Sequence, residues 1–151
     1  MKERLLFLVL VSLIFTLTAA AQSSEKDSVR VPLENYIKGH ATGDGQYMRL
    51  AFHTEGNLIF NRDGKFTTRS FADYIAGFTG KPAADEASRK RSIESIDVTG
   101  NAAVAKIILD YPNTRFVDYM SLLKIDGEWK IVTKIFYAEP KKPAEGKKNG
   151  E

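Results

Sequence analysis

A chain of 151 residues, 43% of them hydrophobic, is long enough for one domain with a buried core. It contains no cysteine, which excludes disulfides, thiol catalysis and lipid attachment at a cysteine, so that packing must supply its stability. The net charge of +3 at pH 7 is mild, and we expect no nucleic acid partner. No P-loop, GxGxxG, CxxC, HExxH or GxSxG pattern occurs, so nothing favours phosphoryl transfer, dinucleotide binding or serine hydrolysis, and no cofactor is predicted.

Residues 1–21 have the pattern of an export signal. Lys2 and Arg4 give a positively charged start, an apolar run covers 5–17, and small residues follow at 19–21. The apolar run is shorter than the about 20 residues that span a bilayer. We therefore expect cleavage after residue 21 and a periplasmic or secreted protein without a stable membrane anchor; the alternative is an uncleaved anchor.

Two helices are predicted to follow a flexible lead-in at 22–28. Pro32 suits the first turn of a helix, and an apolar stripe with helical spacing comes after it. The stripe consists of Leu33, Tyr36, Ile37 and His40. Asp44 is a candidate N-cap for a second, short helix, and His53 comes just past its end.

A short hairpin is predicted around residues 61–64, where Asp-Gly separates two short strands. Ser70 and Asp73 then resemble a capping box at the start of a third helix, which we expect to end at Gly80. Residues 81–91 are predicted to form a charged and mobile connection.

The remaining chain is predicted to be strand. A strand at 92–99 turns into 102–111, and 115–137 forms a long hairpin about Asp126-Gly127, the strongest short-range hairpin signal in the chain. With a two-residue turn, Lys124 faces Trp129, Leu122 faces Ile131, Met120 faces Thr133 and Asp118 faces Ile135. Alternation then gives one nearly apolar sheet face and one mixed face. The apolar face contains Phe116, Asp118, Met120, Leu122, Trp129, Ile131, Thr133, Ile135 and Tyr137.

Apolar helix stripes need a surface to cover, and the apolar face of the long strands is the available one. The sequence therefore predicts an α+β domain with N-terminal helices packed on an antiparallel sheet. Residues 139–151 are predicted to be a disordered tail rich in lysine and proline.

Five segments carry a resemblance to a known family: residues 36–44, 51–53, 96–106, 118–124 and 127–132. Through them the chain resembles the nuclear-transport-factor-2-like superfamily, which includes ketosteroid isomerases and polyketide cyclases, and within it the lumazine-binding group of small bacterial proteins. The resemblance covers residues 29–138. It implies a cone-shaped α+β fold with a curved sheet, a pocket between helices and sheet, and dimers formed through the other sheet face. Because this fold hosts enzymes and binding proteins alike, the resemblance does not choose between them.

Asp118 is the strongest candidate for a site residue. An acid on an apolar face is desolvated, which raises its pKa and suits a general base or a neutral hydrogen-bond donor. The alternatives are a ligand contact, or a structural hydrogen bond to a backbone amide or a hydroxyl such as that of Tyr74.

His40 and His53 are the two histidines of the chain, and both are predicted at helix ends beside the pocket. Either could exchange protons together with Asp118. Two histidines and an aspartate can also ligate a metal, but their spacing offers no tight ligand cluster, so no metal is predicted. The third reading is that they satisfy helix-end carbonyls.

Tyrosines predicted on three helices need partners for their hydroxyl groups, which indicates an interior that is not wholly apolar. The predicted lining of the pocket is Tyr36, His40, His53, Tyr74, Asp118, Met120 and Thr133.

Lysines alternate with apolar residues on the mixed sheet face. Lys106, Lys130 and Lys134 fall there, and such a surface suits a homodimer, or alternatively a solvated face. The sequence thus favours an exported, non-catalytic small-molecule-binding or scaffold protein with an unknown ligand. The alternative is a lyase or isomerase that uses Asp118 with His40 or His53 for proton transfer.

Overall fold

The structure is a computed structural model and describes residues 25–141. The expected export signal, its cleavage site, the first part of the lead-in and residues 142–151 lie outside the described residues. Within 25–141, no helix is both long and apolar enough to cross a membrane.

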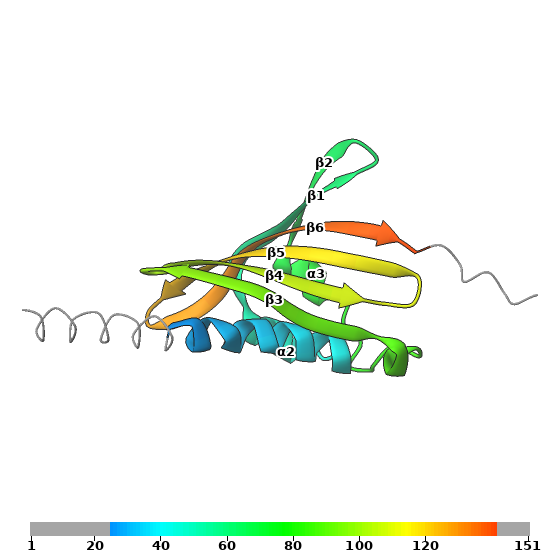
Figure 1. Cartoon of the computed structure of the whole chain (residues 1–151), viewed down its shortest axis with the longest axis horizontal. Helices are drawn as coiled ribbons and strands as arrows, with labels where there is room; N and C mark the ends of the chain where they lie inside the picture. The colour runs from blue at the N-terminus through cyan, green and yellow to red at the C-terminus, as the bar shows by residue number, and fades with distance from the viewer. Residues whose placement is uncertain (1–24, 142–151) are drawn as a thin grey trace, which may run out of the picture.

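A long helix over 25–42 runs along one face of the sheet, as Figure 1 shows in blue and cyan. Its buried stripe of Val29, Leu33 and Tyr36 has the spacing of one helical face, and this stripe covers the sheet. The prediction that the helix begins at Pro32 is wrong, because residues 25–28 of the expected lead-in are already helical. At the N-terminal end Glu25 accepts hydrogen bonds from Trp129 Nε1 (3.0 Å) and Lys124 Nζ (2.7 Å), which ties the helix to the last hairpin.

Two short helices follow. Helix α2, Gly45–Ala51, begins after Asp44, whose side chain accepts a hydrogen bond from the Gln46 amide (2.8 Å), as predicted. Helix α3, Phe71–Ile75, begins at the predicted Ser70 cap, whose hydroxyl accepts from the Asp73 amide. It ends well before Gly80. The connection expected at 81–91 contains a single 3-10 turn, Glu86–Ser88, and its last two residues already belong to a strand.

Six strands form one curved sheet in the order β2-β1-β6-β5-β4-β3 (Figure 1). Their bounds are Phe52–Arg62 (β1), Lys65–Ser70 (β2), Lys90–Thr99 (β3), Ala102–Asp110 (β4), Thr114–Ile125 (β5) and Glu128–Pro140 (β6). All neighbours are antiparallel except β1 and β6, which run parallel, so the sheet is mixed rather than wholly antiparallel as predicted. The first residues of the expected tail, 139 and 140, extend β6.

The β5–β6 hairpin confirms the predicted turn but not the whole register. Asp126 and Gly127 have φ values of 50° and 84°, as a type I′ turn requires, and Lys124 faces Trp129. Beyond Leu122 and Ile131 the pairing shifts by one residue.

The shift arises because Val132 is an extra, unpaired residue on β6, a β-bulge. Ser121 pairs with Thr133, and Met120 pairs with Lys134. Because alternate residues point to opposite faces, one extra residue exchanges the faces of everything after it. The predicted placement of Thr133, Ile135 and Tyr137 on the inner face is therefore wrong.

The core lies between the inner sheet face and the three helices. Its buried members include Leu33, Tyr36, Met48, Phe52, Phe71, Ile107, Met120, Leu122, Trp129 and Ile131. Two polar side chains, Asp118 and Lys134, are buried with them and mark the site described next.

Candidate functional site

Four elements bring five polar side chains together beneath the first helix. Tyr36 and His40 are one turn apart on that helix, and Tyr74 comes from α3. Asp118 lies on β5, and the bulge in β6 turns Lys134 inward to meet it. The predicted residues Tyr36, His40, Tyr74 and Asp118 are thus placed together, and a lysine that we assigned to the other face joins them.

Lys134, Tyr36 and Asp118 form a closed hydrogen-bonded triad. Lys134 Nζ donates to the Tyr36 hydroxyl (3.0 Å), which donates to Asp118 Oδ2 (2.5 Å), and Nζ also lies 3.3 Å from that carboxylate oxygen. Asp118 and Tyr36 are fully buried and Lys134 is 5% exposed. Such a buried ion pair persists only where hydrogen bonds offset desolvation, and the Tyr36 hydroxyl provides one to each partner.

Burial changes the acid–base behaviour of the triad. Desolvation lowers the pKa of Lys134 below its usual value, although Asp118 opposes this by favouring the ammonium form. For Tyr36, desolvation, the negative charge of Asp118 and the neighbouring Tyr74 raise the pKa well above its ordinary value. The phenol of Tyr36 therefore stays protonated and acts as a donor, while the neutral amine of Lys134 becomes more accessible.

His40 and Tyr74 form a second pair beside the triad. The Tyr74 hydroxyl lies 2.8 Å from His40 Nε2. Burial lowers the pKa of His40 well below its usual value, and the positive charges of Lys134 and Arg91 act in the same direction. Burial and the charge of Asp118 raise the pKa of Tyr74. Both groups are thus neutral at pH 7, and the tautomer of the imidazole decides which of them donates the hydrogen bond.

One oxygen of the triad lacks a protein partner. Asp118 Oδ1 is buried, and no hydrogen-bond donor from residues 25–141 contacts it. Buried carboxylate oxygens are ordinarily satisfied, and an exception calls for an explanation such as a catalytic role or a bound water or ion. Oδ1 is thus available as an acceptor.

A cavity of about 500 Å³ opens beside the triad, a size that suits a small molecule. Tyr36, His40, Tyr74 and Lys134 line one part of it. Most of the remaining wall is apolar or aromatic: Leu58, Phe60, Leu109, Tyr111, Phe116 and Phe136. The cavity therefore offers an apolar chamber with a few polar groups converging at one place.

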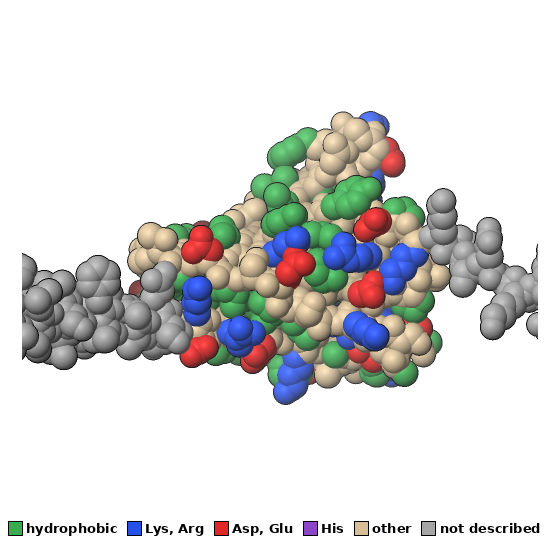
Figure 2. All heavy atoms as spheres, in the orientation of Figure 1, with side chains coloured by type: hydrophobic (Ala, Val, Ile, Leu, Met, Phe, Trp, Pro, Cys, Tyr) green, Lys and Arg blue, Asp and Glu red, His purple; other side chains and the backbone are tan. Residues whose placement is uncertain are grey.

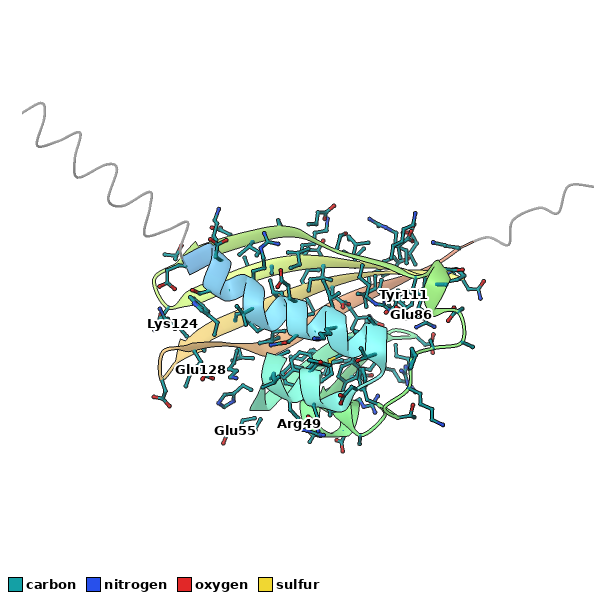
Figure 3. All side chains as sticks on the ribbon, turned by 90° about the horizontal axis from the view of Figure 1, so that it is seen from below. Arg49, Glu55, Glu86, Tyr111, Lys124 and Glu128 are labelled. Carbon is teal, nitrogen blue, oxygen red and sulfur yellow. The ribbon has the colours of Figure 1, made fainter. Side chains whose placement is uncertain are left out.

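Tyr111, at one end of this wall, is held by Arg91, which forms an ion pair with Glu86. Arg91 Nε donates to the Tyr111 hydroxyl (3.2 Å), and both guanidinium nitrogens bind Glu86 (2.6 and 2.7 Å). Arg91 also donates to the carbonyl of His40 at the end of the first helix. Figure 3 shows Glu86 and Tyr111 at the same end of the molecule, with Lys124 and Glu128 at the opposite end. The cavity thus lies away from the β5–β6 turn.

The β1–β2 hairpin supplies the charged part of the wall. Arg62, Thr67, Thr68 and Arg69 line the cavity, and Arg69 also donates to the backbone carbonyl of Asp73. No acidic side chain is part of the lining. The wall formed by the described residues therefore favours neutral or anionic molecules.

Four predicted pocket residues do not line the cavity. Asp118 is fully buried and contacts the cavity only through its two triad partners. His53 is at the start of β1, partly exposed, and its Nδ1 accepts from the Glu55 amide (3.3 Å). Thr133 lines a groove on the outer face of the sheet, because the bulge reverses its direction. Met120 is buried in the core next to the site, on the inner face as predicted, but it does not line the cavity wall.

The outer face is also changed by the bulge. Lys106 and Lys130 have the predicted outward direction, and Lys130 donates to the carbonyl of Leu50 in α2 (3.2 Å), whereas Lys134 is inside. Exposed hydrophobic side chains are prominent there: Val104, Tyr119, Leu123, Ile135 and Tyr137. Figure 2 shows hydrophobic side chains exposed between charged ones over the strands. Within 25–141, no three His, Cys, Asp or Glu side chains are grouped closely enough to hold a metal ion.

Residues 24–137 match the profile of a protein family described as "Putative lumazine-binding". The aldolase FrzH from Cladobotryum sp is 28% identical over 121 residues, which cover 79% of this chain and 95% of that protein. The matched part includes nearly the whole of the relative, so the likeness extends over a complete domain.

Solved structures show the same fold. An NTF2-like protein of unknown function from Shewanella baltica OS155 has a TM-score of 0.70 and 28% identity, covering 79% of this chain and 97% of its own. A second, from Methylobacillus flagellatus KT, has a TM-score of 0.66 and 27% identity, covering 77% and 93%. The architecture and these neighbours confirm the predicted NTF2-like α+β fold.

Proposed function

The chain belongs to the family described as "Putative lumazine-binding", and from this premise we propose that its cavity binds a small carbonyl compound and catalyses carbon–carbon bond formation or cleavage of the aldol type. The observation that carries the proposal is the buried triad of Lys134, Tyr36 and Asp118 beside an otherwise mainly apolar cavity. A relative covered over 95% of its length is named an aldolase, which supports the same class of chemistry.

Aldol chemistry needs a base for the proton next to the carbonyl group and positive charge or donors for the oxygen that becomes negative. Asp118 does not line the cavity itself, so it acts as the base through the Tyr36 hydroxyl, which lines the cavity and contacts Asp118 Oδ2. Lys134 activates the carbonyl group. Because the site is buried, these electrostatic effects are stronger than in water. The partner of Asp118 is thus Lys134 rather than His40 or His53.

Exchange of protons next to the carbonyl group tests this proposal. Purified protein is incubated in D2O with a panel of small aldehydes and ketones, and deuterium incorporation is followed by NMR. We expect exchange above the protein-free rate, and Asp118→Asn to reduce it by about 10²–10⁴-fold. His53→Gln, which lies outside the cavity, is the matched control and should retain the wild-type rate.

Non-catalytic binding of a small molecule is the second candidate. It is favoured by the closed contacts within the site, since Lys134, Tyr36 and Asp118 satisfy most of one another's hydrogen bonds. It predicts no exchange with any carbonyl compound and an Asp118→Asn variant altered only in ligand affinity. Native mass spectrometry of protein purified from its own source would reveal such a ligand as extra mass.

We also propose that two chains associate through the outer sheet face. The support is its exposed hydrophobic side chains, among them Ile135, which is 49% exposed. Ile135→Glu should convert a dimer into a monomer in analytical ultracentrifugation. The matched control is Leu50→Glu in α2, a residue of similar exposure (53%) outside this face. A monomeric wild-type protein would overturn the proposal.

Export is the remaining proposal about the whole protein, and it is supported by the charge and apolar pattern of residues 1–21. Mass spectrometry of the protein recovered from the periplasm or medium should show a chain that begins at Gln22. A chain found only with residues 1–21 still attached would contradict cleavage.

A further inference from the structure

We infer that Lys134 activates the carbonyl compound covalently, by forming an imine with the carbonyl carbon of a small aldehyde or ketone. This inference rests on the function proposed above and specifies how its central residue acts. It is carried by the position of the Lys134 amine at the cavity wall, between the Tyr36 hydroxyl and the Asp118 carboxylate.

The surroundings of Lys134 favour a nucleophilic amine. Its Nζ lies 5.3 Å from the ring centres of Tyr36 and Tyr74 and 4.8 Å from that of Phe136. These rings and the strands exclude water, so the ammonium form loses hydration, and the lowered pKa agrees with this. A desolvated lysine beside a cavity is the arrangement that imine-forming enzymes need.

The neighbouring groups can carry every proton that the step requires. The amine lone pair attacks the carbonyl carbon, a C–N bond forms, and the carbonyl electron pair moves to oxygen. Asp118 accepts a proton from the nitrogen, and the Tyr36 hydroxyl, which contacts both residues, relays it to the oxygen. The oxygen leaves as water with both amine hydrogens. The product is an imine, whose protonated form withdraws electrons from the bond to be made or broken.

A purely structural ion pair accounts less well for the geometry. Replacing a buried ion pair by apolar residues often leaves stability unchanged or improves it, so stability alone does not call for one. In a structural pair one expects each buried polar atom to be satisfied, yet Asp118 Oδ1 has no donor among residues 25–141. Lys134 also lines the cavity, although it is only 5% exposed.

The cavity wall indicates the class of carbonyl compound. Aromatic side chains make up about half of it, and Arg62 and Arg69 line it together with Lys134. We therefore expect an aldehyde or ketone with an apolar or aromatic body, in which an anionic group is tolerated next to the arginines. A cationic group is disfavoured because no acidic side chain of residues 25–141 lines the wall.

Pentane-2,4-dione tests the imine without knowledge of the natural substrate. A neutral lysine amine condenses with one of its carbonyl groups, loses one water, and the product rearranges to a stable enaminone. The intact protein is treated at pH 7.5, and peptide mapping by mass spectrometry locates each added diketone less one water. We expect one adduct per chain, at Lys134, formed at least about 10-fold faster than any adduct at the partly exposed Lys106.

The control variants are Lys134→Met, which should abolish the fast adduct, and Lys106→Met, which should retain it. Because the adduct is mapped on the unmutated protein, the result does not depend on how well Lys134→Met folds. Absence of an adduct at Lys134, or equal modification of several surface lysines, overturns the inference.

Failure of the imine and failure of the proposed function are distinguishable. If wild-type protein catalyses carbonyl proton exchange but forms no adduct at Lys134, the proposed function stands and Lys134 acts without a covalent bond. If the adduct forms but no exchange is found, the nucleophilic lysine stands and the proposed function does not.

Discussion

The β5–β6 hairpin has two halves that differ in composition although the same strands form both. Between the turn and the bulge, the inward residues Leu122, Trp129 and Ile131 make an ordinary apolar core. Beyond the bulge, the inward residues Asp118 and Lys134 make a buried ion pair beside a cavity. One extra residue separates a half that stabilises the fold from a half that is arranged for chemistry.

The ion-paired half should give the largest response to a single substitution. Asp118→Leu leaves Lys134 buried without a carboxylate, which typically costs about 3–5 kcal/mol of unfolding free energy. Urea denaturation measures the loss. In the double variant Asp118→Leu/Lys134→Met most of this loss should be recovered, because no buried charge remains.

A loss below about 1 kcal/mol in Asp118→Leu would mean that Lys134 reaches solvent or neutralises at little cost, and would contradict the closed site.

The apolar half should respond through packing alone. Leu122→Ala removes a side chain that is 1% exposed, and such truncations cost about 2–5 kcal/mol. Carbonyl proton exchange by the folded variant should remain at the wild-type rate, because Leu122 lies on the turn side of the bulge. Exchange that falls together with stability would show that the two halves are coupled rather than separate.

The contrast between the halves also explains what could be predicted from the sequence. The turn at Asp126-Gly127 has a specific backbone requirement, so the register near it follows by counting. The bulge at Val132 has no such signature. Beyond the bulge, both alternating sets of strand residues are apolar. Ile135 and Tyr137 belong to one set and Phe136 to the other, so alternation alone could not assign the faces.

Tyr36, His40 and Tyr74 were predictable as lining residues and Asp118 as a polar neighbour, because a polar group on an apolar stripe needs a partner, and the fold supplies one. Lys134 was missed because its place depends on the bulge. The available signal was that Lys134 stands in a segment where both alternating sets of residues are apolar, so that either face would bury apolar side chains beside it.

The Tyr36 hydroxyl connects the two charged residues, and its removal should have a moderate effect. Tyr36→Phe deprives Lys134 of an acceptor and Asp118 of a donor, for an expected loss of about 1–3 kcal/mol. Tyr119→Phe, on the outer face of β5, is the matched control and should change stability by less than about 0.5 kcal/mol. Differential scanning calorimetry or urea denaturation compares them. Equal losses of unfolding free energy in the two variants would show that the Tyr36 hydroxyl does not stabilise the site.

The smallest expected effect is a pH dependence that arises from His40, on the first helix beside the ion-paired half. His40 has a folded-state pKa well below the value near 6.5 of the unfolded chain, first because of burial and then because Lys134, Arg91 and Arg89 are nearby cations. Below about pH 6.5 the unfolded state therefore binds more protons than the folded state, and stability falls as the pH is lowered. The contribution of His40 is complete above pH 6.5, and its slope is at most about 1.4 kcal/mol per pH unit.

In His40→Gln this part of the slope should disappear between pH 6.5 and 5, measured by urea denaturation at each pH. The variant His53→Gln, which removes the other histidine at the partly exposed start of β1, is measured beside it as the matched comparison. Carboxylates contribute to acid sensitivity in all three proteins, so the difference between the variants, rather than either slope alone, isolates His40. If His40→Gln keeps the full slope, the His40 imidazole is not enclosed with Tyr74 and Lys134 as the structure places it, and water reaches the ion-paired half of the hairpin.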